Sequence, residues 1–304
     1  MDGCDMKIER IGEFGLINKI KAMLKTDASV IKGAGDDCAV VKFNRDKYML
    51  LTCDMLVEGI DFLKKDDPYL AGAKSMVVSI SDIAANGGWP AYALISLGLP
   101  GNIRLGYVKE FYRGMSLWAD KYKINIVGGD ISRAEKLTLS LSLIGFVEKR
   151  CLTLRSGACV GDIVFVTGRL GAALVDKRRL HVKPRLEEAR YLVKNYRINS
   201  MIDISDGLPQ DLHHIAAESK VGAAIFKELV PLHKKDADFL RALSLGEDFE
   251  LLFTMPAAEA KRLTASGIKT YSPIGEITDK RYGLRLIDED HKERPLKPVG
   301  FRHF

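Results

Sequence analysis

Seven aspartates stand out in this sequence, most of them in apolar or glycine-rich surroundings. An ionised carboxylate is costly to bury in such surroundings without a partner, and solvent-facing aspartates normally stand among other polar residues. We therefore expect these side chains to have partners. They are Asp36 and Asp37 after Gly33-Ala34-Gly35, Asp54 after an apolar run, Asp82 within a long apolar helical stretch, Asp130 after Gly128-Gly129, and Asp203 and Asp206 around a strand end.

Each aspartate also has a structural interpretation as a helix cap or a turn residue. Asp206 precedes Gly207 and an expected helix, which is the best case for an N-cap, and Asp37 also fits a turn. Asp82 fits neither, because it lies in the middle of the apolar stretch 77–85. Its structural alternative is a buried hydrogen bond to the backbone.

Carboxylates held close together raise one another's pKa unless cations neutralise them. Mg²⁺ takes oxygen ligands, commonly one or two carboxylates with water and substrate phosphates. A set of aspartates without His or Cys therefore indicates magnesium and phosphate chemistry rather than zinc. The glycines beside Asp36 and Asp130 fit this interpretation, because glycine lets backbone amides approach phosphate oxygens.

The sequence contains no P-loop, no GxGxxG fingerprint and no protein-kinase motif set. We therefore expect a phosphotransferase of another fold.

The helices and strands that position the aspartates are predicted from the spacing of apolar residues and from the glycines and prolines that end an element. In the first half we expect helices over 11–25, 68–86 and 105–121 and strands over 38–43, 48–52, 92–97, 124–127 and 137–147. In the second half we expect a short helix after Gly168, helices over 185–196, 208–218 and 257–265, strands over 163–167, 201–204, 223–226 and 249–254, and two final strands.

A length of 304 residues favours two domains, because single hydrophobic cores rarely grow larger. We place them at 1–150 and 151–304, the first with mixed strands and helices (α+β) and the second α/β. With 47% hydrophobic and 28% charged residues, the chain belongs to the ordinary globular class.

The charge pattern argues against nucleic acid as a partner. The formal charge is +6, and the one dense basic stretch, 177–197, mixes basic residues with glutamates and apolar residues. This pattern is typical of a solvated amphipathic helix. The small net positive charge still favours the electrostatic attraction of anionic nucleotides.

Five cysteines, an odd number without a CxxC pair, argue against a disulfide framework and a zinc site. The sequence shows no signal-peptide pattern at its start and no apolar run of membrane-spanning length. We therefore expect a cytoplasmic protein in a reducing compartment, without a membrane partner.

The acidic motifs together resemble the thiamine-monophosphate kinase family, over nearly the whole chain. This family belongs to a superfamily with aminoimidazole ribonucleotide synthetase, selenophosphate synthetase and the hydrogenase-maturation dehydratase. The matching segments, in order, are 35–40 (GDDCAV), 52–59 (TCDMLVEG), 81–87 (SDIAANG), 128–130 (GGD), 155–157 (RSG), 203–208 (DISDGL) and 246–251 (GEDFEL).

The resemblance implies an N-terminal domain that forms a barrel-like dimer interface, a C-terminal α/β domain, and an active site between them. It implies that the chain is a homodimer that uses several Mg²⁺ ions to transfer the γ-phosphoryl group of ATP to thiamine monophosphate. The implied metal ligands are Asp36, Thr52, Cys53 through its backbone, Asp54, Asp82, Asp130, Asp203 and Asp206, of which Asp36, Asp82, Asp130 and Asp203 would be catalytic. The implied ATP contacts are Tyr112, Gly129, Asp130, Arg155 and Ser205, and the implied contacts of the acceptor are Asp61, Glu247 and Phe301.

The chain departs from the family pattern at several positions. The family usually has Ser or Thr at Cys53, often His at Asp61, Tyr at Phe249, and paired threonines at Ile131-Ser132. For Cys53 the alternative is a small buried hydrophobic residue. For Phe301 the alternative is an aromatic residue of the core.

A phosphate acceptor is mostly dianionic at neutral pH, so this reaction needs charge neutralisation and in-line positioning more than a general base. One rival is a selenophosphate synthetase-like activity, but Cys4 lacks the lysine-bearing pattern that this enzyme needs after its reactive residue. A purine-synthetase-like activity is disfavoured by segments 203–208 and 246–251. The other rival is a non-catalytic sensor of nucleotide or thiamine phosphate, which could lose metal ligands, whereas this chain keeps the core aspartates.

Overall fold

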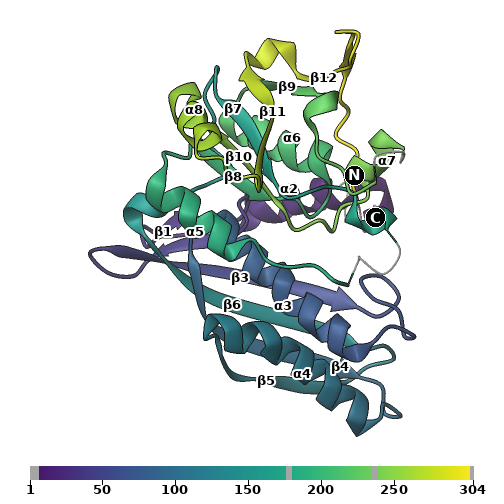
Figure 1. Cartoon of the computed structure of the whole chain (residues 1–304). Helices are drawn as coiled ribbons and strands as arrows, with labels where there is room; N and C mark the ends of the chain where they lie inside the picture. Colours follow the sequence, from purple (N-terminus) through teal and green to yellow (C-terminus); the bar gives the residue numbers. More distant parts are fainter. Residues whose placement is uncertain (1–6, 176–179, 235–237, 302–304) are drawn as a thin grey trace, which may run out of the picture.

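Two β-sheets, one in each half of the chain, organise the structure (Figure 1). The computed structural model describes residues 7–175, 180–234 and 238–301. The first sheet has the strand order β1-β2-β3-β6-β4-β5. Its strands are β1 (Val30–Lys32), β2 (Ala39–Lys42), β3 (Lys47–Val57), β4 (Trp89–Leu99), β5 (Asn125–Arg133) and β6 (Thr138–Glu148).

The second sheet has the order β13-β12-β9-β11-β7-β10-β8. Of its described neighbouring pairs, only β12 and β9 run parallel, so it is a mixed sheet rather than the parallel one typical of α/β domains. Its strands are β7 (Ile163–Thr167), β8 (Ser200–Asp203), β9 (Gly222–Phe226), β10 (Leu251–Met255), β11 (Tyr271–Thr278), β12 (Leu284–Ile287) and β13 (Glu293–Pro295). The two sheets and their helices form the mixed two-domain fold that the sequence predicted.

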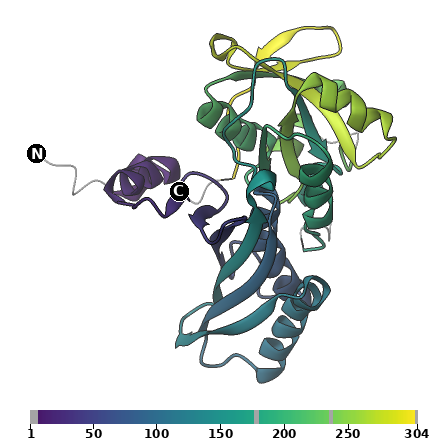
Figure 2. The same ribbon diagram turned by 90° about the vertical axis from the view of Figure 1, so that its left-hand side faces the viewer.

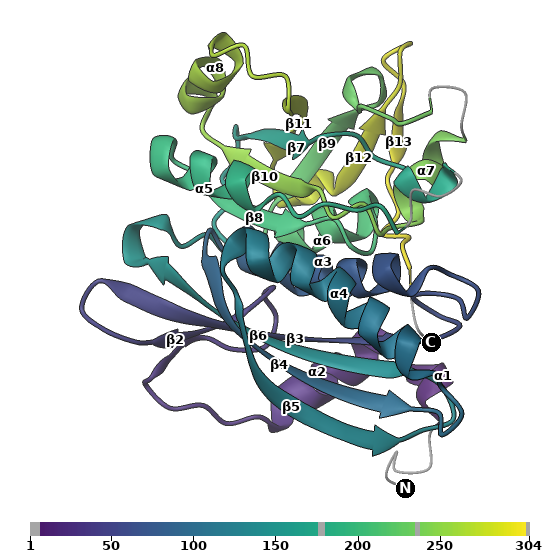
Figure 3. The same cartoon turned by 60° about the horizontal axis from the view of Figure 1, so that its bottom comes forward.

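Eight α-helices are described, and none of them is long and apolar enough to cross a membrane. They are α1 (Ile8–Ile11), α2 (Glu13–Met23), α3 (Pro68–Ala85), α4 (Leu105–Tyr122), α5 (Leu186–Asn195), α6 (Leu208–Ser219), α7 (Phe239–Ser244) and α8 (Ala257–Ala265). Helices α3 and α4 cover one face of the first sheet, whereas α1 and α2 stand to one side of both halves (Figures 2 and 3).

Helix α3 lies between the first sheet and the second half, where it packs on α5 and β8 as well as on β3 (Figures 1 and 3). The Asp67 carboxylate caps it by accepting from the Tyr69 N–H at 2.8 Å, and Pro68 opens it, as the sequence predicted. A Cβ at Gly72 would lie 1.9 Å from the Phe111 carbonyl oxygen, so glycine allows α3 and α4 to approach closely. Thirteen residues of α3 are buried, which makes it the central element of the molecule.

Most predicted elements are confirmed, including the hairpin of β2 and β3. The predicted ends of two strands are wrong. β3 continues through Asp54 to Val57 because it pairs with β6 along its full length. β5 likewise continues through Gly129 and Asp130 to Arg133, paired with β4. Short β1, α7 and a third late strand were not predicted, since three to six residues give too little periodicity to recognise.

Candidate active site

The carboxylates of the acidic motifs meet along α3, where this helix faces β3 on one side and β8 on the other. The Thr52 hydroxyl on β3 donates to the Asp82 carboxylate. One turn earlier, the Ser79 hydroxyl donates to Asp54 at 2.5 Å. Toward the second half, Ser81 donates to Asp203 at 2.7 Å. Asp82 thus has a side-chain hydroxyl as its partner, and not the backbone group that was its structural alternative.

Three carboxylates come together at this place. Oxygens of Asp37, Asp82 and Asp203 all lie within 4.8 Å of one another. Burial raises the pKa of Asp82 well above its usual value, and the charges of Asp54, Asp203 and Asp37 raise it further. Burial, followed by the charge of Asp37, raises the pKa of Asp203 to about 8. Such a group favours either bound protons or a bound cation.

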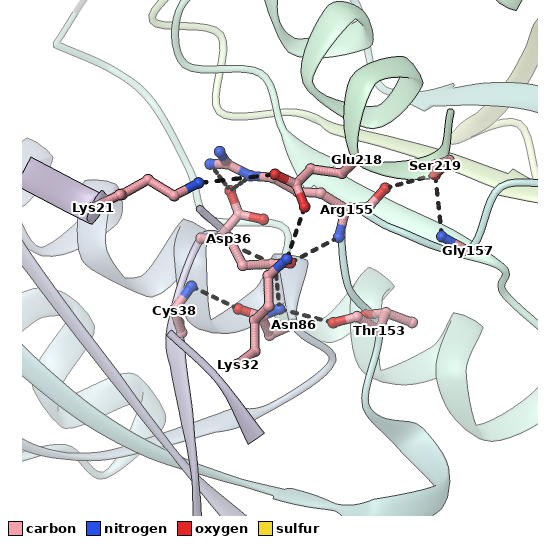
Figure 4. A network of polar contacts seen from close by, with 11 residues as sticks. Lys21, Lys32, Asp36, Cys38, Asn86, Thr153, Arg155, Gly157, Glu218 and Ser219 are labelled. Atoms are coloured by element: carbon pink, nitrogen blue, oxygen red, sulfur yellow. Dashed lines mark hydrogen bonds and ion pairs between the residues drawn. The ribbon is translucent and has the colours of Figure 1, made fainter. Parts of the chain in front are cut away.

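Arg155 provides positive charge beside this group. Its guanidinium binds Asp37 at 2.7 Å, while its backbone N–H donates to Asp36 at 3.2 Å (Figure 4). Burial disfavours the charged guanidinium, but the carboxylates of Asp37, Asp36 and Asp203 together outweigh this effect and raise the pKa of Arg155. The Arg155 carbonyl in turn accepts from Ser219 at 3.2 Å, which attaches the loop to α6.

Asp36 lies beside the three-carboxylate group and has its own set of partners. It accepts from the Asn86 amide at 3.0 Å, and its Oδ2 lies 3.9 Å from the Lys32 ammonium (Figure 4). Burial, with the charge of Asp37 in second place, raises the pKa of Asp36 to about 6. Burial likewise raises the pKa of Asp54 to about 6. All four predicted aspartates on β3, α3, β8 and the loop before β2 are therefore close neighbours or share partners.

A cavity of about 450 Å³ opens next to Arg155, between α2 and α6. Its lining includes Arg155, Ser205 and Asp206, three residues predicted to hold ATP or an ion, together with Lys21 from α2. The lysine gives this wall of the cavity a positive group. α2 had no predicted part in the site, because its sequence shows only an amphipathic helix.

A second carboxylate group lines the same cavity. Ligand atoms of Asp206, Asp211 and His214 lie within 4.8 Å of one another. Asp206 is not the predicted N-cap of α6, since Gly207 occupies that position and its N–H is bound by Asp211 at 2.9 Å. Burial lowers the pKa of His214 to about 4, so the imidazole is neutral near pH 7.

Two of the three residues predicted for the acceptor, Asp61 and Glu247, meet at one buried cation. The Lys74 ammonium on α3 donates to the Asp61 carbonyl at 2.8 Å and to the Glu247 carboxylate. Phe301 is 40% exposed, so the alternative of a core aromatic is wrong. Its backbone N–H donates to the Asp206 carbonyl at 3.0 Å, which places the end of the described chain beside the cavity.

Asp130 lies on the opposite face of the first sheet from Asp54. In the strand register, Asp130 pairs with Ser96, Ser96 with Ser140, and Ser140 with Met55. Because neighbouring residues of a strand point to opposite faces, Asp130 shares the open face with Met55, whereas Asp54 faces α3. The described chain therefore does not bring Asp130 to the carboxylates on α3.

Tyr112, Gly129 and Cys53, like Asp130, are absent from the cavity lining. Tyr112 is half-buried on α4 and packs against the core. A Cβ at Gly129 would lie 1.7 Å from the Ile95 carbonyl oxygen, so glycine is needed there for strand packing. The Cys53 side chain is exposed on the open face, 3.4 Å from the Ser140 hydroxyl, so the alternative of a buried hydrophobic residue is wrong.

The donor set fits Mg²⁺. The group consists of buried carboxylate oxygens with adjacent hydroxyls, and Asp37 Oδ2 is buried without a hydrogen-bond partner. Oxygen ligands of this kind are what Mg²⁺ prefers. Sequence reasoning left Asp37 out of the implied metal ligands and noted that it also fits a turn, although its place beside Asp36 in a glycine-rich motif was a usable signal. Lys74 was missed because a single lysine in an apolar helix gives no indication of its partners.

Known proteins are similar to this chain over nearly its whole length. Residues 35–147 match the family "AIR synthase related protein, N-terminal domain", and residues 160–287 match the corresponding C-terminal domain. The chain is 38% identical to the thiamine-monophosphate kinase of Aquifex aeolicus, over 98% of this chain and 100% of the relative. It is 32% identical to that of Bacillus subtilis, over 96% and 99%.

The structural comparison gives the same result. The solved structure "AaThiL complexed with AMPPCP and TMP" superposes with a TM-score of 0.86 at 34% identity, covering 99% of this chain and 100% of the other. Nearly full-length similarity in both sequence and structure shows that this chain belongs to the thiamine-monophosphate kinase family.

Proposed function

We propose that the carboxylates along α3 carry out, with Mg²⁺, the ATP-dependent phosphorylation of thiamine monophosphate to thiamine diphosphate. The observation that carries this proposal is the approach of Asp37, Asp82 and Asp203 within 4.8 Å in a buried setting. The relative bound to AMPPCP and TMP supports the two substrates. The chain is a kinase, because it belongs to a family of kinases.

Asp37, Asp82 and Asp203 would hold Mg²⁺, with Asp36, Thr52, Asp54 and the Cys53 carbonyl around them. Asp206 would hold a further ion at the cavity. Bound Mg²⁺ supplies positive charge that offsets the repulsion between the acceptor phosphate and the triphosphate.

The protein's own side chains orient these carboxylates. Hydroxyls of Thr52, Ser79 and Ser81 each donate to one aspartate and so fix its direction. Arg155 holds Asp37 and lines the cavity, where with Ser205 it would contact the nucleotide phosphates. No general base is needed, because the acceptor phosphate is already mostly dianionic at neutral pH.

The open face of the first sheet supports a homodimer. Met55, Leu94 and Val127 are each 45–63% exposed, on three strands of this sheet. Large apolar residues that cover one sheet face mark an interaction surface. A second copy on this face would also bring its own open-face residues close, among them Asp130, which with Tyr112 and Gly129 we retain as proposed contacts of metal or ATP.

We also propose a division of labour between two domains, 1–150 and 151–304. The first sheet ends at Glu148 and the second begins at Ile163, which supports a boundary in the connection between them. The carboxylates come from both parts, which supports a reaction site between the domains.

The test is incubation with ATP, Mg²⁺ and thiamine monophosphate, followed by chromatography of the products. We expect thiamine diphosphate and ADP in equal amounts. ADP release without thiamine diphosphate contradicts the proposal and favours an activity of another superfamily member. Binding of either ligand without turnover favours a sensor.

A further inference from the structure

The buried ammonium of Lys74 lies in the acceptor region, and the proposed mechanism gives it no role. Its side chain is 1% exposed, which is rare for lysine unless the charge is paired. Its two hydrogen-bond partners among the described residues come from different parts of the molecule: the Asp61 carbonyl from the loop after β3, and Glu247 from the second half. Lys74 therefore joins the two halves at the acceptor residues.

Glu247 is held at both its backbone and its side chain. Its φ of +60° lies in the left-handed region, where a non-glycine residue is strained. Its N–H donates to the Ser205 carbonyl at 2.8 Å, and its carboxylate meets Lys74. Asp61 is fixed likewise, since its carboxylate accepts from the Val57 N–H at 2.7 Å.

The helix periodicity relates this cluster to the metal site. Lys74, Ser81 and Asp82 lie on one face of α3, because residues seven and eight apart fall on the same side. At 1.5 Å per residue, Lys74 and Asp82 are about 12 Å apart along the axis. Extended thiamine phosphate has a similar length, so it can reach from one group to the other.

Charge indicates which end of the substrate lies at Lys74. The cluster holds two carboxylates, of Asp61 and Glu247, and one ammonium, so its net charge is negative. It therefore suits the cationic thiazolium and the aminopyrimidine better than a phosphate. The phosphate would then lie at Asp82, where the carboxylates and their cations are.

We propose that Lys74 is a positioning residue that fixes Glu247 and Asp61 around the organic end of thiamine phosphate, and so directs the phosphate to the carboxylates of α3. This inference rests on the proposed function. Lys74 acts through its two neighbours, and its loss leaves the Glu247 carboxylate without its buried partner.

The test is Lys74→Met, which keeps an unbranched side chain, shorter by the charged end atom, and removes the charge. We expect the KM for thiamine phosphate and the inhibition constant of unphosphorylated thiamine to rise together, by about tenfold or more, as for a lost charged hydrogen bond. The KM for ATP should stay within about twofold of the wild type. The matched control is Ser75→Ala, which removes a buried hydrogen bond of the same helix, to Gly72, and should leave all three constants unchanged.

The double variant Lys74→Met/Glu247→Gln separates positioning from folding. Removal of the unpaired charge should restore thermal stability while the affinity for thiamine stays low. Unchanged constants in Lys74→Met overturn the inference, and so does a rise for thiamine phosphate alone, which places Lys74 at the phosphate. A wild-type chain without turnover contradicts the proposed function, whereas an active wild type with an unaffected variant contradicts this inference alone.

Discussion

Ser81 on α3 donates a hydrogen bond of 2.7 Å to Asp203 on β8, and both side chains are buried. This contact joins the two halves of the chain at the carboxylates. Ser81→Ala should lower the free energy of unfolding by about 1–3 kcal/mol, because it leaves a buried acceptor without its donor. Urea titration with and without Mg²⁺ measures this change in the free energy of unfolding. Mg²⁺ should recover part of the loss in Ser81→Ala but none in the control Ser75→Ala.

Arg155→Met should weaken ATP binding and destabilise the protein. The variant leaves the buried Asp37 carboxylate without its partner, a change that typically costs about 3–5 kcal/mol. Steady-state kinetics should show a raised KM for ATP and a smaller change in the KM for thiamine phosphate. Equal changes in both KM values would contradict the place of Arg155 at the nucleotide cavity.

The stability of the metal-free protein should fall as pH rises from 6 to 8. The pKa of Asp203 is about 8 in the folded protein, against about 3.9 for an unperturbed aspartate, so in this range the folded state binds the proton and the unfolded state does not. Deprotonation then leaves crowded buried charges that Mg²⁺ can neutralise. Thermal melts should show greater stabilisation by Mg²⁺ at pH 8 than at pH 6, and a pH-independent effect would contradict the carboxylate site.

Met55→Asp should dissociate the proposed homodimer. Met55 is 63% exposed on the open face of the first sheet, where a charge would oppose apolar contact with a second copy. Light scattering after size-exclusion chromatography measures the mass. Leu105→Asp is the control, since Leu105 is similarly exposed, at 69%, but opens α4 on the covered side of the sheet. A wild-type monomer, or loss of the dimer in both variants, would contradict the assignment of this face.

The sequence was sufficient to predict the long elements and the carboxylates, because α3 and the paired strands carry strong periodicity and the aspartates interrupt apolar runs. It was not sufficient to predict which face of the sheet each residue occupies. Asp130 and Asp54 both follow apolar runs, yet strand register places them on opposite faces. Lys74 was missed for a related reason, since its partner Glu247 is 173 residues away and only the packed fold brings them together.

The most direct test of the account is Asp82→Asn, which keeps the shape of the side chain and removes one buried charge from the three-carboxylate group. The measurement is thiamine diphosphate formation from ATP and thiamine monophosphate with Mg²⁺, alongside circular dichroism to confirm the fold. We expect formation to be abolished while the fold is intact. Full activity in Asp82→Asn would contradict the assignment of the reaction to the carboxylates of α3.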